Sequence, residues 1–188
     1  MISYQGGNPA ALLDACVLVP MCLCDTLLRL AKEPAMYRPV WSDAIIEEIG
    51  NTLEQKLGLT SEQSSRRIGQ MSRAFPDAII QPRESLHETL TGIPDPDDRH
   101  VLAAAIAGRA NVVVTNNLRH FPQEYLAQFG ILRQSADEFL MTQFQRNSPL
   151  VIERLDEQAA DIRRRRADVI SVLKRVVPKF ADLVESAS

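Results

Sequence analysis

Two short apolar runs in this chain each contain, or are followed by, a polar residue that is rare in buried strands. Residues 111–115 contain three consecutive valines and lead into an asparagine pair that includes Asn117. Residues 11–19 are rich in Leu and Val and contain Asp14. Such runs are typical of parallel strands that are covered on both faces. We therefore expect a parallel sheet whose strands bring Asp14 and Asn117 to the same edge, where ligands of open α/β sheets collect.

Helical patterns fill the segments between these runs. Leucines within residues 23–30 recur at helical spacing, and Ser42 can cap a second helix that carries Glu48. Thr60 and Gln63 form the pattern of a capping box for a third helix. Strands that alternate with helices in this way predict an α/β domain.

The middle of the chain predicts one more strand and one more helix. Residues 78–81 have the length of a short strand. Asp95 followed by Pro96 is typical of a helix start, with Asp98 in the first turn of a helix rich in small residues. The predicted fold is a three-layer α/β domain with a central parallel sheet.

After about residue 134 only helical patterns remain, including one long segment over residues 149–177. We therefore predict a core over residues 1–134 and a helical C-terminal extension over 135–188, packed on the core or on a partner. A chain of 188 residues has room for this arrangement.

Composition excludes some classes of protein. A net charge of −3 and a pI of about 5.7 argue against a protein that coats nucleic acid electrostatically. Three cysteines without a CxxC pair predict neither a disulfide framework nor a zinc site. Charged residues interrupt the early apolar stretch, so we expect a cytoplasmic protein without a membrane segment.

Three stretches together resemble the PIN-domain ribonucleases, and within them the VapC-type toxins of bacterial toxin–antitoxin modules. The stretches are LLDACVLVP, WSDAIIEEI and DPDDRHVLAAAIAGRANVVVTNNLRHFP. The resemblance implies that Asp14, Glu48 and Asp98 are the catalytic acids. It also implies that these three acids and Asn117 hold a metal ion, with Thr115 supporting them at the end of the valine strand.

The implied activity is hydrolysis of RNA phosphodiester bonds by a Mg²⁺- or Mn²⁺-dependent endoribonuclease. These cations prefer oxygen ligands, as a ring of carboxylates provides, and they activate water and neutralise phosphate charge. The resemblance further implies a toxin with an RNA substrate, such as tRNA or rRNA, and a cognate antitoxin as partner. It leaves open whether the protein forms a homodimer.

Several residues near the implied site have a second interpretation. Asp95 is more typical of a helix cap than of a ligand, although it is close enough in sequence to support Asp98. Arg99, Arg119 and His120 are candidates for RNA contact, but each is also an ordinary surface residue. The arginine run 163–166 is expected on the solvent-facing side of an amphipathic helix, with nucleic-acid contact as the alternative.

Other functions lack their defining residues. A phosphatase of the haloacid dehalogenase type needs a second Asp two residues after the first, where this chain has Cys16. Glycine-rich phosphate-binding motifs are absent. Departures from the toxin pattern at Cys16, Cys24 and His120 keep one rival open, namely a catalytically weak or inactive PIN-like module that binds RNA or a partner protein.

Overall fold

The computed structural model describes residues 8–187, which form a five-stranded parallel sheet surrounded by helices. The strands lie in the order β3-β2-β1-β4-β5, and every neighbouring pair is parallel. The bounds are β1 Ala10–Leu13, β2 Arg38–Ser42, β3 Ile79–Ile80, β4 Val112–Val114 and β5 Leu132–Gln134. The predicted α/β class with a central parallel sheet is confirmed.

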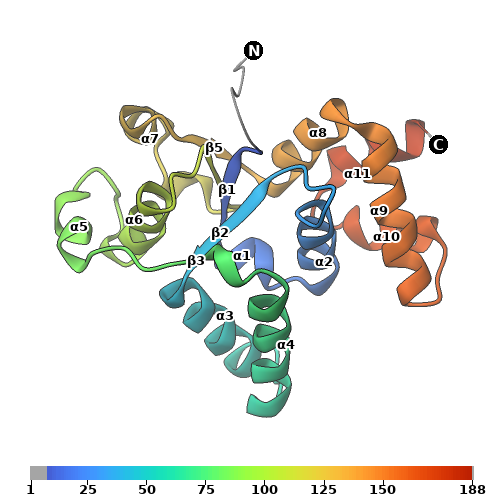
Figure 1. The fold of residues 1–188 in the computed structure, drawn as a ribbon, viewed down its shortest axis with the longest axis horizontal. Helices are drawn as coiled ribbons and strands as arrows, with labels where there is room; N and C mark the ends of the chain where they lie inside the picture. Colours follow the sequence, from blue (N-terminus) through green and yellow to red (C-terminus); the bar gives the residue numbers. More distant parts are fainter. Residues whose placement is uncertain (1–7, 188) are drawn as a thin grey trace.

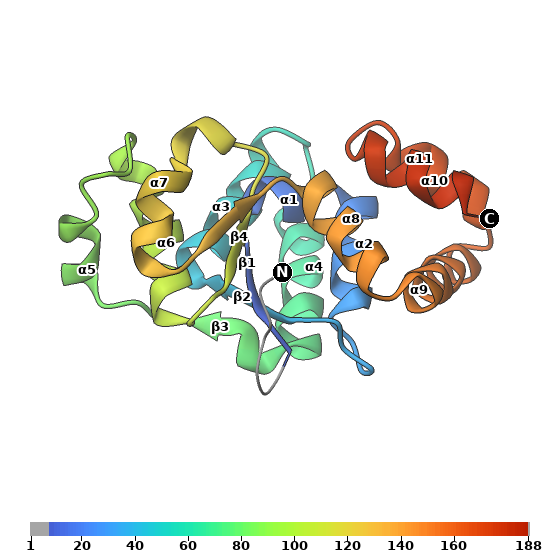
Figure 2. The same cartoon turned by 90° about the horizontal axis from the view of Figure 1, so that it is seen from above.

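Helices cover both faces of the sheet. They are α1 (Ala15–Leu18), α2 (Met21–Leu30), α3 (Asp43–Gln55), α4 (Ser61–Ala74), α5 (Glu84–Thr89), α6 (Arg99–Ala107), α7 (Gln123–Leu126), α8 (Ala136–Arg146), α9 (Ser148–Asp161), α10 (Arg166–Leu173) and α11 (Pro178–Ser186). Figure 2 shows α5, α6 and α7 on one side of the strands and α2 and α8 on the other, which gives three layers. In Figure 1, α3 and α4 project from the sheet as a pair.

The central strands are held by apolar contacts on both faces. All residues of β1 and β4 are buried. Leu12 pairs with Val40 on one side and with Val113 on the other, and Leu13 pairs with Val114. Complete burial of a Leu or Val side chain contributes about 1.5–3 kcal/mol. This register fixes the height at which β1 and β4 end, and therefore the position of the residues that follow them.

The first strand is shorter than the sequence predicts. β1 ends at Leu13, and Asp14 lies in extended backbone directly after it, as the N-cap of α1. The prediction of one strand over residues 11–19 was therefore wrong, because Ala15–Leu18 folds back as a single helical turn. The consequence is that Asp14 stands at the carboxyl end of the strand rather than within it.

Other local predictions had mixed outcomes. Ser42 caps α3, and Thr60 and Gln63 form a capping box at α4, as predicted. The short strand expected in residues 78–81 is β3. Asp98 does not lie in the first turn of α6 but ends the 3-10 turn η2 (Pro96–Asp98) and precedes α6.

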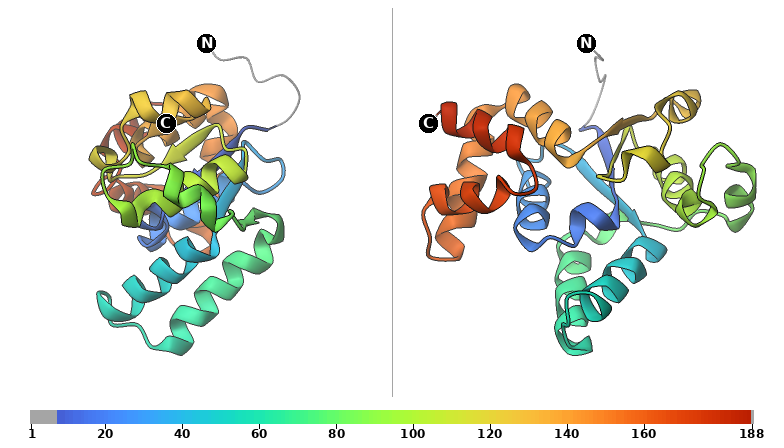
Figure 3. Two further views of the ribbon diagram at one scale, coloured as in Figure 1. Left: turned by 90° about the vertical axis from the view of Figure 1, so that its left-hand side faces the viewer. Right: turned by 180° about the vertical axis from the view of Figure 1, so that it is seen from behind.

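The C-terminal helices do not include the long helix that was expected. α9 ends at Asp161, and Arg163 has a positive φ of 55°. α10 starts only at Arg166, so the arginine run lies mostly in the connection between two helices and not along one helix face. Figure 3 shows α9, α10 and α11 gathered on one side of the molecule, beyond α2.

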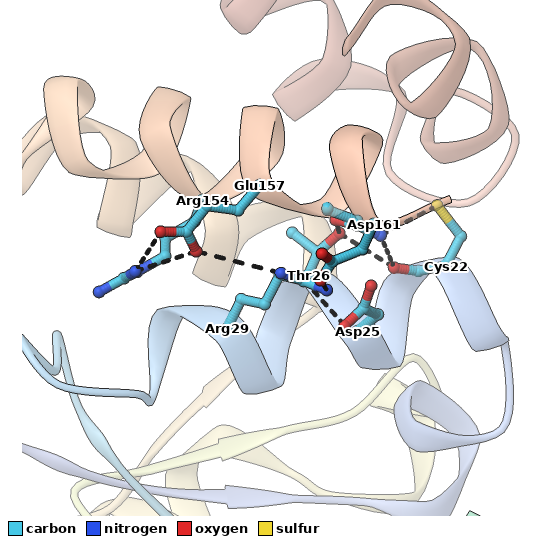
Figure 4. Close-up of polar contacts among 8 residues, drawn as sticks. Cys22, Asp25, Thr26, Arg29, Arg154, Glu157 and Asp161 are labelled. Carbon is cyan, nitrogen blue, oxygen red and sulfur yellow. Dashed lines mark hydrogen bonds and ion pairs between the residues drawn. The ribbon is translucent and has the colours of Figure 1, made fainter. Parts of the chain in front are cut away.

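Polar side chains join α9 to α2. The Thr26 hydroxyl donates to Gln158 Oε1 at 2.7 Å, and Gln158 Nε2 donates to the Cys22 carbonyl at 3.0 Å. Arg29 donates to Asp161 at 2.6 Å, and Figure 4 shows this contact between the two helices. Apolar side chains of α9, α10 and α11 belong to the same continuous core as the sheet. No helix within residues 8–187 is both long and apolar enough to cross a membrane.

Candidate metal centre

Asp14 and Thr115 meet at the carboxyl ends of neighbouring strands. The backbone amide of Asp14 donates to the Val114 carbonyl at 3.1 Å, and that of Thr115 donates to the Gln134 carbonyl at 3.0 Å. The Thr115 hydroxyl donates to Asp14 Oδ2 at 2.6 Å, and both residues are buried. Within the described chain no hydrogen bond reaches Asp14 Oδ1. One carboxylate oxygen is therefore fixed by the protein, and the other is available to a ligand.

Cys16 is a third member of this corner. Its thiol donates to Asp14 Oδ2 at 3.1 Å, and its sulfur accepts from the Asn116 amide at 3.2 Å. Burial, together with the charge of Asp14, raises the pKa of the Cys16 thiol to about 12. A neutral thiol is a poor nucleophile and a poor metal ligand. Cys16 thus orients Asp14, a role that was not predicted, although its place two residues after Asp14 was a usable signal.

Glu48 faces the two aspartates from α3. The helix buries Ile45, Ile49 and Leu53 and leaves the Glu48 side chain about 50% exposed. Burial raises the pKa of Glu48, and the charges of Asp14 and Asp98 raise it further. The three acids predicted as catalytic are therefore close enough to repel one another. A divalent cation among them would relieve that repulsion.

Asp98 contacts His120 across the site. His120 Nδ1 lies 2.6 Å from Asp98 Oδ2. Asp95 caps η2 by accepting from the Asp97 amide at 3.0 Å. Potential ligand atoms of Asp95, Asp98 and His120 all lie within 4.8 Å of one another. Asp95 therefore acts as the expected cap and also lies near Asp98. His120, which was predicted only as a candidate for RNA contact, lies in direct contact with Asp98.

A hollow of about 410 Å³ opens between α3 and the start of α6. Glu48, Asp98 and His100 line it. His100 Nε2 lies 3.9 Å from Glu48 Oε2, while its Nδ1 is buried without a hydrogen-bond partner among the described residues. Burial lowers the pKa of His100, against the opposite effect of Asp14 and Asp98. The imidazole is therefore less readily protonated than an ordinary histidine side chain.

The remaining residues that were predicted for the site make fewer contacts there. Asn117 donates its backbone amide to Thr115 Oγ1 at 3.0 Å, and its side chain makes no hydrogen bond within residues 8–187. Arg99 and Arg119 are not among the residues that line the hollow. Lys56, at the C-terminal end of α3, lines it instead. This position was not predicted, although helical spacing places Lys56 on the same face of α3 as Glu48.

The donor set fits a hard divalent cation. Asp14, Glu48 and Asp98 offer carboxylate oxygens, and the side chains of Asn117 and Asp95 could add neutral or charged oxygen donors. Oxygen-rich sets of this kind suit Mg²⁺ or Mn²⁺ and not the softer metals that prefer thiolate or several imidazoles.

Comparison with known proteins identifies a matching family model and a similar curated protein. A family model described as the PIN domain matches residues 10–119. A curated protein named "Putative ribonuclease VapC50", from Mycobacterium tuberculosis (strain ATCC 25618 / H37Rv), is 37% identical over 87 residues. That alignment covers 45% of this chain and 52% of the relative, so the chain spans about half the length of the curated relative.

Proposed function

This chain belongs to the PIN-domain family, and from that premise we propose that it is a Mg²⁺- or Mn²⁺-dependent endoribonuclease. The observation that most supports the proposal is the convergence of three acids from separate elements. Asp14 follows β1, Glu48 lies on α3 and Asp98 precedes α6. Burial and the charges of Asp14 and Asp98 raise the pKa of Glu48. A carboxylate whose pKa is raised by neighbouring acids is typical of a site that binds a cation.

The chain's own residues have separate roles in this reaction. A bound divalent cation would supply an activated water and neutralise charge on the cleaved phosphate. Asp14, Glu48 and Asp98 would hold this cation, and Thr115 and Cys16 keep the Asp14 carboxylate in one orientation. Asn117, and Asp95 beside Asp98, support the site, while His120 holds one oxygen of Asp98. Because no side chain here is an activated nucleophile, direct attack by water on the phosphodiester is the consistent route.

The likeness to a relative named "Putative ribonuclease VapC50" supports a proposal for the biological role. We assign the chain to the toxin component of a type II toxin–antitoxin system, acting in the cytoplasm on RNA such as tRNA or rRNA. Its partner would be a cognate antitoxin protein, and a homodimer is compatible with this role. The 1–134 segment would act as the nuclease core, with 135–188 as a helical extension that shares its hydrophobic core.

One alternative has specific support. His120 Nδ1 contacts one carboxylate oxygen of Asp98, and the neutral Cys16 thiol donates to Asp14. Both features reduce the negative potential available to a cation, as expected for a catalytically weak module that binds RNA or a partner.

A metal add-back assay separates the two functions. The purified protein is incubated with bacterial RNA in EDTA, and then with excess Mg²⁺ or Mn²⁺, and the new RNA ends are sequenced. The proposed function predicts defined internal cuts that appear only with the divalent cation. RNA that binds but stays intact at every metal concentration would favour the inactive module.

A further inference from the structure

A polar stripe on α3 leads away from the three acids. Glu48, Asn51, Thr52, Gln55 and Lys56 follow one another at steps of three and one residues, which places them on one helix face. All five line the hollow described above. We call the last four, from Asn51 to Lys56, the α3 stripe. It lines the hollow together with Asp97 and Asp98.

The side chains of the α3 stripe are free to bind a ligand. Within residues 8–187, none of them makes a hydrogen bond or an ion pair with another side chain. Asn51, Gln55 and Lys56 are exposed, while Thr52 is half-buried. The stripe thus presents uncommitted amide, hydroxyl and ammonium groups to the hollow, whereas the buried face of α3 is fixed by Ile45, Ile49 and Leu53.

Charge is distributed unevenly along this face of α3. Glu47 and Glu48 lie at one end, and Asp97 and Asp98 line the same hollow. Lys56 lies at the other end, and it is the single lysine or arginine among the described residues that line the hollow. A phosphate is repelled by the acids unless a cation is present, but Lys56 attracts one directly. The neutral groups between the two ends suit the less charged parts of a nucleotide.

The dimensions agree with a short stretch of nucleic acid. The eight-residue step from Glu48 to Lys56 spans about 12 Å at the α-helical rise of about 1.5 Å per residue. That is roughly the rise of three stacked nucleotides at about 3.4 Å each. The hollow, at about 410 Å³, has the volume of a small-ligand pocket. It can take an unpaired base but not a double helix.

We propose that the α3 stripe binds an unpaired RNA segment beside the cleaved bond. Lys56 holds a backbone phosphate, and the amides of Asn51 and Gln55 contact the edge of a base. Unpaired bases expose their hydrogen-bonding edges, and side-chain amides offer both a donor and an acceptor to them. This inference rests on the endoribonuclease function proposed above, to which it adds the residues that bind the substrate and select the bases beside the cut.

The test compares four single variants on one probe, a short single-stranded RNA library with randomised positions, cleaved in Mn²⁺. Lys56→Gln removes the phosphate contact, and its matched control Arg66→Gln removes an exposed positive charge on α4, outside the hollow. Gln55→Ala removes a base contact, and its control Gln145→Ala removes an exposed amide on α8. The readouts are KM, kcat, the salt dependence of kcat/KM and the bases found beside the cut.

Lys56→Gln should raise KM roughly five-fold with little change in kcat, and should reduce the logarithmic salt slope by about one. Gln55→Ala should weaken the base preference at one position beside the cut by about ten-fold. Both controls should match the wild type.

If Lys56→Gln and Gln55→Ala behaved like their controls while the wild type cleaved the library, the inference would be overturned and the endoribonuclease function would stand. Failure of the wild type to cleave any RNA in Mn²⁺ would instead contradict the function itself.

Discussion

The hydroxyl of Thr115 donates a 2.6 Å hydrogen bond to Asp14 Oδ2, although the two residues are 101 positions apart in sequence. The pairing of β1 with β4 makes this possible, because Leu13 lies opposite Val114 and the next residue of each strand reaches the sheet edge. Thr115 is fully buried, so its hydroxyl has no access to water in place of Asp14.

Replacement of Thr115 by valine should loosen Asp14 and weaken the metal site. Residues that orient metal ligands typically contribute 10- to 100-fold in affinity, so Thr115→Val should reduce Mn²⁺ affinity by about ten-fold in calorimetric titration. Thr115→Ser keeps the hydroxyl and serves as the control, with affinity close to that of the wild type. Equal affinity for the valine and wild-type proteins would show that Asp14 needs no support from Thr115.

Glu48 gives the metal-free protein a distinct pH dependence. Burial and the neighbouring acids raise its pKa above the ordinary 4.5, so the folded state binds more protons than the unfolded state between the two pKa values. Stability is therefore lost as pH rises through the raised pKa. Glu48→Gln should raise the melting temperature in EDTA at pH 7, and should have no such effect at about pH 3, where the carboxyl is protonated in both states.

The neighbouring Glu47 provides the control for this experiment, since Glu47→Gln removes the same charge from an exposed position on α3. Its effect on the melting temperature should be smaller. A Glu48→Gln variant that melts like the wild type at pH 7, or that is stabilised equally at both pH values, would contradict the electrostatic account.

Asn117 contributes no negative charge at the end of β4, and Asn117→Asp should tighten Mn²⁺ binding by roughly ten-fold because it adds a carboxylate ligand. Asn116→Asp is the matched control. It adds the same charge one residue earlier and keeps an oxygen for the Ala136 amide, which Asn116 Oδ1 binds at 3.2 Å. If the two variants bound Mn²⁺ equally, the effect would be one of general charge and Asn117 would not face the metal.

The contact between α2 and α9 contributes to stability through buried polar groups. Thr26→Val leaves Gln158 Oε1 buried without its donor, which typically costs about 1–3 kcal/mol. The double variant Thr26→Val, Gln158→Leu replaces both partners with apolar groups and should lose less stability than the two single variants added together. Urea unfolding measures all three. Strict additivity would show that the 2.7 Å contact contributes no coupling.

The sequence was informative where a local pattern determines the structure. Capping residues such as Ser42 and Thr60 predicted helix starts because a side-chain cap depends on neighbours only three residues away. The valines of β4 predicted a buried strand for a similar reason. β2 was missed because Pro39 near its start argues against a strand inside a sheet. β5 was missed because Leu132–Gln134 contains two polar residues and therefore shows no apolar run.

Within the candidate site, the three acids were predicted from the family resemblance, but the residues that contact them were not. The contact of His120 with Asp98 depends on a 3-10 turn (Leu118–His120) that returns the chain toward α6. Lys56 reaches the same hollow from two helical turns beyond Glu48. The first relation depends on the packing of distant elements, for which a single sequence contains no signal. The second follows in part from helical spacing, which places Lys56 on the same face of α3 as Glu48.

The most direct test of the central claim is the rate of RNA cleavage by Asp14→Asn and Asp98→Asn in saturating Mn²⁺. Each change removes one negative charge from the proposed cation site and preserves side-chain size. The fold should remain intact, as checked by melting temperature and circular dichroism. The account predicts that each variant cleaves the wild-type substrate roughly a hundred-fold more slowly or not at all. Cleavage by either variant at the wild-type rate would contradict the assignment of that acid to the metal centre.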